Sequence, residues 1–195
     1  CSRFSHRITD QMLIGIIVAV LNTVIANPNL LDADAEISRY TPSIEITRQQ
    51  NEISRLMEIP DVDFQVKYVP ESMQDYLSPA FYMIPAIDNL TENVIYINNG
   101  QTASGLNLYT TLAHEGYPGH LYQTNYFLTT NPSPLRTFLH CAGYDEGWGT
   151  YAQLYSYNFI EFKNVDEQTT KQLRQLYRDN DLLSLSLSSL CDLYV

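Results

Sequence analysis

Two histidines, His114 and His120, lie six residues apart in the segment TLAHEGYPGHLYQ, and Glu115 directly follows the first of them. The imidazole nitrogens of neutral histidine bind zinc and related transition metals. A carboxylate beside such a metal can accept the proton of an attacking water molecule. The chemistry that this group of side chains indicates is therefore metal-assisted hydrolysis.

The spacing differs from that of the H-E-x-x-H motif of zinc peptidases, in which two histidines four residues apart share one helix face. At about 100° per residue, histidines six residues apart differ by about 240° and would point away from each other on a regular helix. Pro118 and Gly119 lie between them, and these residue types kink or interrupt helices. The histidines can therefore converge only if the helix is distorted at Tyr117–Gly119, by a π-type bulge or a break.

A catalytic zinc site needs a third protein ligand and one position open to water. Glu146 is the best candidate, because it lies 26 residues beyond His120 on the next predicted helix, in the segment YDEGWGTYAQ. Its neighbour Asp145 is the alternative ligand. Gly147 and Gly149 destabilise the interior of that helix, so we expect a ligand or a neighbouring helix to approach the backbone there.

The elements that must position these residues are predicted from hydrophobic periodicity. Apolar residues at three- and four-residue spacing predict helices, whereas short β-rich runs bounded by Pro, Asp and Asn predict strands. Residues 86–93 read as a hairpin connection between two of the strands. The expected helices cover residues 9–26, 37–57, 104–130, 135–159 and 167–194, and the expected strands cover residues 64–69, 80–84 and 94–98.

These elements predict an α+β fold that is mostly helical, with a small, mainly antiparallel sheet packed on a helical bundle and a zincin-like active-site helix. We expect one partial domain over residues 1–195. Its helical N-terminal part would cover residues 1–60, its sheet residues 61–100, and its helical metal-site part residues 101–195. In the stretch 182–190, LLSLSLSSL, we expect a buried helix whose serine hydroxyls bond back to the backbone.

The charge balance limits the partners of this chain. It contains 22 acidic and 11 basic side chains, a net charge of −11 at pH 7, and no Lys or Arg between Lys67 and Arg136. Such a chain is a poor candidate for binding nucleic acid or an anionic membrane surface, because both attract positive charge. The imbalance is compatible with holding a cation, and the oligomeric state stays open.

The longest apolar run, Met12–Leu21, is shorter than the roughly 20 residues that a membrane span needs. It lacks the basic flank and the cleavage site of a signal peptide, so we expect a buried helix and no membrane insertion.

The cysteines are Cys1, Cys141 and Cys191, too few for a disulfide scaffold. We expect small buried thiols, with a bridge between the last two as the alternative. Because the chain starts without Met and ends within an apolar-periodic stretch, we expect a piece of a larger protein.

Together these motifs resemble a known family. HEGYPGHLYQ followed by GYDEGWGTYAQLYSY is similar to a bacterial family known as domain of unknown function 885, whose members look like gluzincin-type zinc peptidases. The match extends through Ser78–Asn98 upstream and Leu176–Val195 downstream, so it covers most of residues 38–195. Many members are secreted proteins or lipoproteins, which implies an extracellular or cell-envelope location. The visible chain has no targeting segment, so the cytoplasm stays open as the alternative.

The resemblance also implies roles for the residues of the site. His114, His120 and Glu146 would bind zinc, and Glu115 would be the general base that activates water and returns the proton to the leaving amine. The substrate would be a peptide. The strand Val94–Asn98 would be an edge strand that binds an extended peptide by adding a strand to the sheet.

Further side chains could support the site or contact the substrate. Asp192 matches an acidic position of the family and is a candidate hydrogen-bond partner of a ligand histidine. Tyr117, Tyr144 and Tyr151 are candidate donors to the oxyanion, and Tyr82 is a further candidate substrate contact. The sequence does not choose among these tyrosines, and the oxyanion donor could also lie outside this chain.

Two other functions fit parts of the same pattern. One is a non-catalytic metal-binding or peptide-binding domain on the same scaffold. The other is a metal-free structural helical domain with both histidines in its core. The presence of Glu115 favours catalysis over the first, since a decayed site often loses its base first, and a metal analysis would decide the second.

Overall fold

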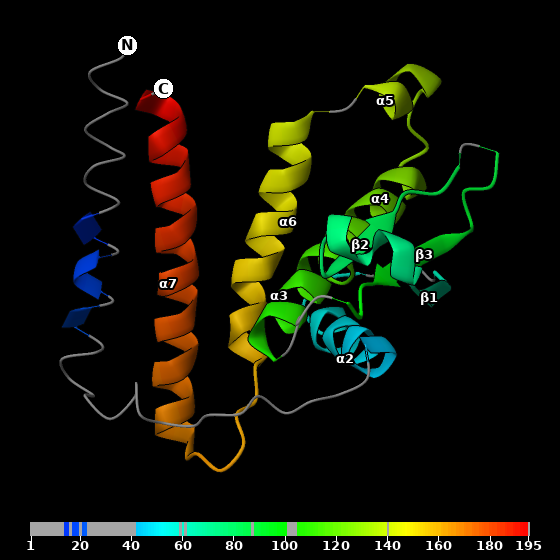
Figure 1. Cartoon of the computed structure of the whole chain (residues 1–195). Coiled ribbons are helices and arrows are strands. Elements are labelled where there is room, and N and C mark those ends of the chain that lie inside the picture. Colours follow the sequence, from blue (N-terminus) through cyan, green and yellow to red (C-terminus); the bar gives the residue numbers. More distant parts are fainter. Residues whose placement is uncertain are drawn as a thin grey trace. The chain divides into compact units, whose positions relative to one another are not determined.

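The computed structural model of the protein describes residues 14–15, 17–19, 21–22, 42–58, 60, 62–86, 88–100, 105–139 and 141–194 (Figure 1). The expected α+β fold, mostly helical with one small sheet, is confirmed. The chain divides into two compact units. One unit comprises Ile37–Phe159 and contains the sheet and both histidines, and the other comprises Cys1–Glu36 together with Ile160–Val195.

The sheet of the first of these units is three-stranded and mixed, with the order β1-β3-β2. Strands β1 (Phe64–Tyr68) and β3 (Asn93–Ile97) pair in parallel, and β2 (Ala80–Met83) pairs with β3 in an antiparallel orientation. The antiparallel pair follows from the short connection predicted between β2 and β3. Strands β1 and β3 are parallel because the 3-10 helix η2 (Glu71–Tyr76) and β2 separate them in the chain and leave room for a crossover. The expected mainly antiparallel sheet is thus corrected to a mixed one.

Strand β3 is the central strand of this sheet and not the edge strand that we expected at residues 94–98. Val94, Ile95 and Ile97 are all buried, although successive residues of a strand face opposite sides of the sheet. Apolar residues on both faces are typical of a strand that is covered on both sides. The outer strands of the described sheet are β1 and β2, and β2 contacts helix α3 (Leu106–Glu115).

Helix α3 makes the widest set of contacts in this unit. It packs against α2 (Pro42–Ser54), against α6 (Ala142–Ser156) and against strand β2 (Figure 1). Helix α4 (His120–Thr129) follows α3 after a short turn and also packs against α6. The single helix expected here is therefore two helices. The short helices α5 (Pro134–Phe138) and η3 (Tyr157–Phe159) precede and follow α6 in the chain.

The hydrophobic core of the unit joins the sheet to these helices. Ile46 of α2, Ile95 of β3, Leu112 of α3 and Leu121 of α4 are almost wholly removed from solvent, and Tyr117 packs with them. Burying one such aliphatic side chain contributes about 1.5–3 kcal/mol of hydrophobic free energy. The core therefore fixes α3 and α4 on both sides of the turn that separates them.

A polar network closes the same unit beside the core. Arg48 of α2 pairs with Glu45, donates a hydrogen bond to the carbonyl oxygen of Phe159 at 3.1 Å, and lies over the ring of Tyr109. The Tyr109 hydroxyl donates to the carbonyl oxygen of Ser156 at 2.8 Å, and burial raises the pKa of this phenol well above its ordinary value. The network ties α2 and α3 to the end of α6.

In the other unit, helix α7 covers Glu167–Tyr194, the range that the sequence predicts. Ser184, Ser188 and Ser189 donate hydrogen bonds to main-chain carbonyl oxygens one turn earlier, as expected. These serines are exposed, so the expected burial of this stretch is not observed. Bonding back to the helix satisfies a hydroxyl group without a tertiary partner, which explains why the stretch does not need to be buried.

The described positions of the helix expected over residues 9–26 are helical, but Ile14 and Leu21 expose 60% and 53% of their surface. These side chains, like those of Ile17 and Val18, are therefore not buried as expected, and residues 9–13, 16, 20 and 23–26 of that helix lie outside the described residues. None of the described helices is long and apolar enough to span a membrane.

The two described cysteines, Cys141 and Cys191, are exposed free thiols. The expectation of buried thiols is therefore wrong for both, and the alternative of a bridge between them is not observed. Cys141 directly precedes α6, where the backbone is extended, and Cys191 lies in the exposed last turn of α7. Cys1 lies outside the described residues.

Candidate metal centre

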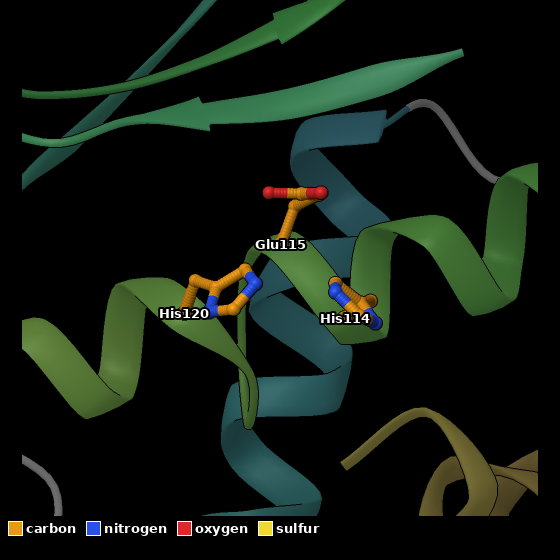
Figure 2. A group of neighbouring side chains, drawn as sticks. All are labelled: His114, Glu115 and His120. Carbon is orange, nitrogen blue, oxygen red and sulfur yellow. The ribbon is translucent and has the colours of Figure 1, made fainter. Parts of the chain in front are cut away.

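The expected distortion between the two histidines is a complete break in the helix. Helix α3 ends at Glu115, α4 begins at His120, and residues 116–119 form a turn between them. The break brings the imidazole rings of His114 and His120 together, with ring centroids 4.7 Å apart and planes at 80° (Figure 2). The prediction that Tyr117–Gly119 redirects the chain is confirmed.

The turn depends on a glycine and on contacts from two sides. A Cβ atom on Gly119 would collide with the main-chain carbonyl of His114, so glycine is needed where the chain returns this closely to α3. Trp148 of α6 donates its indole N–H to the carbonyl oxygen of Pro118 at 2.9 Å. On the inner side, the ring of Tyr117 is fully buried in the core. The turn is thus anchored to both α6 and the core.

The third group of the site is the carboxylate of Glu146, on α6. One of its oxygen atoms lies 3.4 Å from Nε2 of His114, and the other lies 3.9 Å from Nε2 of His120. Glu146, and not the alternative Asp145, is therefore the acidic residue that approaches both imidazoles. The Glu146 side chain is 67% exposed, whereas each histidine side chain is 17% exposed. The three groups thus meet where solvent can reach them.

The second nitrogen of each imidazole is hydrogen bonded to a glutamine. Nδ1 of His114 lies 3.1 Å from the amide oxygen of Gln153, and Nδ1 of His120 lies 3.3 Å from that of Gln123. In the tautomer that carries its proton on Nδ1, each ring donates a hydrogen bond to an amide oxygen. Nε2 is then unprotonated, and its lone pair points toward Glu146. This is the tautomer that a metal bound at Nε2 requires.

The close approach expected at the glycines of α6 is found at one of them. A Cβ atom on Gly149 would lie 2.7 Å from Nε2 and 2.8 Å from Cε1 of His114, closer than real Cβ atoms come to their neighbours. A Cβ atom on Gly147 would have nothing within 4 Å. Gly149 therefore makes room for the imidazole of His114, and the space beside Gly147 is open.

Glu115 extends from the last residue of α3 toward the sheet (Figure 2). Its Oε2 atom accepts a hydrogen bond of 3.0 Å from the main-chain N–H of Tyr82, in strand β2. One nitrogen from each imidazole and one oxygen of Glu115 all lie within 4.8 Å of one another. Glu115 is thus beside the two histidines and is held to β2 at the same time.

Comparison with known proteins identifies the family of this chain. The family model described as "Bacterial protein of unknown function (DUF885)" matches residues 19–168. The chain belongs to the DUF885 family. The resemblance seen in the sequence is therefore confirmed for the family, and no curated protein matches the DUF885 chain.

A solved structure shares the fold of this DUF885 chain. It is a crystal structure described as "the putative lipoprotein from Colwellia psychrerythraea", with a TM-score of 0.68, 19% sequence identity and 93% of this chain covered. The chain spans 34% of the length of that protein. At this level of identity the similarity shows a common fold.

Two of the tyrosines considered as substrate contacts are buried in the DUF885 structure. Tyr117 is inaccessible to solvent within the core, so it cannot donate to a substrate. Tyr82 exposes 8% of its surface, and its hydroxyl donates to the side-chain oxygen of Asn93 at 2.6 Å. Burial raises the pKa of the Tyr82 phenol well above its ordinary value. The burial of these two phenol groups leaves neither of them accessible to a substrate in the described structure.

Tyr144 and Tyr151 are exposed on α6. At about 100° per residue, they lie about 160° and 140° around the helix from Glu146. Their side chains therefore leave α6 on the face away from the carboxylate, where the ring of Tyr151 packs against that of Trp148. That either tyrosine donates to an oxyanion at the site stays a prediction. Asp192 is exposed on α7 in the other unit, and its suggested bond to a ligand histidine stays a prediction.

The site also contains groups that sequence reasoning missed. Gln153 lies seven residues after Glu146, and this spacing of about two turns puts both on one face of α6. Gln123 is likewise one turn after His120. A search for polar residues at helical spacing from the ligands could have found both. The main-chain N–H of Tyr82 gives no such signal, because nearly every residue carries an N–H group.

Proposed function

We propose that this DUF885 domain is a zinc-dependent, peptidase-like hydrolase. In this proposal His114, His120 and Glu146 hold the metal and Glu115 acts as the general base. The observation that carries it is the position of the Glu146 carboxylate, whose two oxygen atoms approach Nε2 of both histidines from a different helix. Such convergence of two imidazoles and one carboxylate is the donor set of many catalytic zinc sites.

The separations between these atoms are compatible with zinc. Two ligand atoms of a tetrahedral site, each about 2.0–2.2 Å from the metal, lie about 3.3–3.6 Å apart. The Glu146 oxygen atoms lie 3.4 Å from His114 Nε2 and 3.9 Å from His120 Nε2. The first already has this value, and a small rotation of an exposed carboxylate would bring the second to it. Three protein ligands leave the fourth position free for water or substrate.

Glu115 suits the role of base better than that of ligand. Its Oε2 atom is engaged by the N–H of Tyr82, and the Glu146 oxygen atoms already approach both imidazoles. When bound, zinc supplies a Lewis acid that activates water and polarises a carbonyl group. The Glu115 carboxylate then accepts the proton of the attacking water and delivers it to the leaving amine. Its place beside the histidines keeps it within reach of that water.

A peptide is the substrate that the neighbouring sheet favours. Strand β2 is an outer strand of the described sheet and contacts α3, the helix that carries His114 and Glu115. An extended peptide can add to such a strand through main-chain hydrogen bonds. This role belongs to β2, since β3 is central. A cell-envelope or extracellular location is proposed on the fold shared with a protein described as a lipoprotein.

The test is the variant Glu115→Gln in the full-length protein, with zinc content and cleavage of a broad peptide library as the measurements. We expect zinc to be retained and hydrolysis to fall by about 10²–10⁴-fold, the usual contribution of a general base. His114→Ala is the matched variant that should lose both zinc and hydrolysis. Turnover unchanged in Glu115→Gln would rule out the role of this residue. Wild-type protein that binds zinc but cleaves nothing would instead indicate a binding domain.

A further inference from the structure

We infer that the main-chain N–H of Tyr82 is the group that positions the general base, so that strand β2 orients Glu115 and borders the substrate site at once. This inference rests on the proposed function and extends it. The hydrogen bond from Tyr82 N to Glu115 Oε2 is 3.0 Å long and joins residues 33 positions apart in the chain. A bond between a backbone N–H and an ionised carboxylate is about twice as strong as one between neutral groups.

The register of the sheet explains why this N–H is free for Glu115. In antiparallel pairs, residues alternate between those bonded to the partner strand and those whose N–H and C=O point away from it. Asn98 donates to the carbonyl oxygen of Pro79, and the register continues with Phe81 opposite Tyr96. Tyr82, opposite Ile95, is therefore at a position that points away from β3. No strand of the described sheet therefore accepts a hydrogen bond from this N–H.

The side chain of Tyr82 fixes the strand at this position. Its hydroxyl donates to Asn93 Oδ1 at 2.6 Å, and the same oxygen accepts a 3.0 Å hydrogen bond from Asn125 of α4. Asn93 and Asn125 are both buried. Tyr82 is thus bonded through its side chain to β3 and through its backbone to the base, while Asn125 links the same point to the helix that begins with His120.

This arrangement determines what each oxygen of the base can do. Oε2 is held by β2, so the orientation of the carboxylate is set before any substrate arrives. The remaining lone pairs are left for the proton of the attacking water. A peptide added to β2 would have to bond through the other outward groups of the strand, because the carboxylate binds the Tyr82 N–H more strongly than a neutral carbonyl would. One strand therefore aligns both reaction partners.

The first test measures amide hydrogen exchange in the metal-free protein, so that it does not depend on hydrolysis. In Glu115→Ala, which has no acceptor, we expect the Tyr82 amide to exchange on the order of tenfold faster than in the wild type. Glu115→Gln keeps an acceptor oxygen and should preserve most of the protection. The Phe81 amide, which faces β3, is the internal control and should not change. Equal exchange of the Tyr82 amide in the wild type and in Glu115→Ala would overturn the inference.

The second test removes the N–H itself. Tyr82→Pro lacks this donor and the hydroxyl bond to Asn93 but loses no main-chain bond to β3, because proline is tolerated on outer strands where the N–H faces outward. Tyr82→Ala is the matched variant, since it lacks the same ring and keeps the N–H. With equal zinc content in both, we expect kcat to be roughly tenfold lower in the proline variant, with little difference in KM. Equal kcat values in the two variants would contradict the inference.

The two tests separate this inference from the proposed function. If the wild-type protein cleaves no peptide, the proposed function fails, and the exchange measurement alone decides whether β2 holds Glu115. If Tyr82→Pro does not fold, the exchange measurement again decides. If hydrolysis is normal and the Tyr82 amide is unprotected, the positioning role fails while the hydrolase remains.

Discussion

Gly147 and Gly149 show how residues of one type, two positions apart, serve different purposes. A Cβ atom on Gly149 would meet the imidazole of His114, whereas one on Gly147 would meet nothing. The sequence predicted a close neighbour for both glycines and could not tell them apart. Only the packing of α3 against α6 distinguishes them, because the face of α6 that carries Glu146 and Gly149 is the face that contacts His114.

The corresponding prediction compares two single substitutions. Gly149→Ala should lower zinc affinity by roughly 10–100-fold, as loss of other groups that orient a ligand histidine does, because the new methyl group displaces the His114 ring. Gly147→Ala should leave zinc affinity unchanged and stabilise the folded protein by about 0.5–1 kcal/mol, since alanine is the better helix former. Competition with a chromophoric chelator measures the first effect and urea unfolding the second. Equal zinc affinity in the two variants would contradict the steric role of Gly149.

At the scale of elements, the helices were the part of the fold that the sequence predicted best. The range of α7 and the interruption at Tyr117–Gly119 follow from local signals, namely apolar periodicity and the Pro-Gly pair. The order of the strands was not predictable in the same way. The pairing of β1 with β3 joins segments separated by η2 and β2, and no local pattern specifies such a partner.

The residues of the candidate site also differ in how far the sequence alone could predict them. The groups that lie together, the imidazoles of His114 and His120 with the carboxylates of Glu115 and Glu146, could be singled out in the sequence because their chemistry is visible in their identity. The sequence could not choose among the tyrosines, because the same phenol can lie in a core or on a surface. Tyr117 sits in the turn of the motif and yet points into the core, a direction set by tertiary packing.

A prediction at the scale of elements concerns the start of α7. Asp166 precedes this helix and accepts a 2.7 Å hydrogen bond from the main-chain N–H of Thr169, which lowers the pKa of the carboxyl group below its ordinary value. A carboxyl group with a lowered pKa in the folded state stabilises the fold above its ordinary pKa and loses this effect as the pH falls. Asp166→Ala should therefore lower Tm by about 2–4 °C at pH 7.

The difference in Tm between the wild type and Asp166→Ala should shrink as the pH falls below about 4, the ordinary pKa of this group, because the unfolded chain then binds a proton that the folded carboxylate resists. Asp166→Asn is the control, because it keeps an oxygen acceptor without a titrating charge, and it should depend less on pH. Thermal unfolding followed by circular dichroism from pH 7 to pH 3 measures both. A difference that stays constant over this range would exclude the carboxylate as its source.

At the scale of the molecule, the three proposed ligands come from three helices, α3, α4 and α6. A metal that binds all three binds only the folded unit, so it should shift the folding equilibrium by mass action. At a free zinc concentration 100 times the Kd, we expect the free energy of unfolding to rise by about 2.7 kcal/mol. Full-length protein unfolded in urea with zinc or with a chelator provides the measurement.

Two controls sharpen this measurement. Magnesium prefers oxygen ligands, so it should produce little of the stabilisation. His120→Ala removes one ligand and should abolish most of the zinc effect while leaving the chelator-treated protein close to the wild type. Stabilisation by zinc that persists in His120→Ala would place the ion at another site.

The break between α3 and α4 also bears on how proteins of this kind are found. The histidines on either side of it are two residues further apart than in H-E-x-x-H, so a search for that motif does not find this chain. A more suitable pattern is a His-Glu pair, two variable residues, Pro-Gly and a second histidine, with a glutamate 26 residues later and a glutamine seven residues beyond it. Natural sequences that keep these positions but have a larger residue at the position of Gly149 would be informative. In them the motif is present, but the larger side chain would occupy the space that the His114 imidazole fills here.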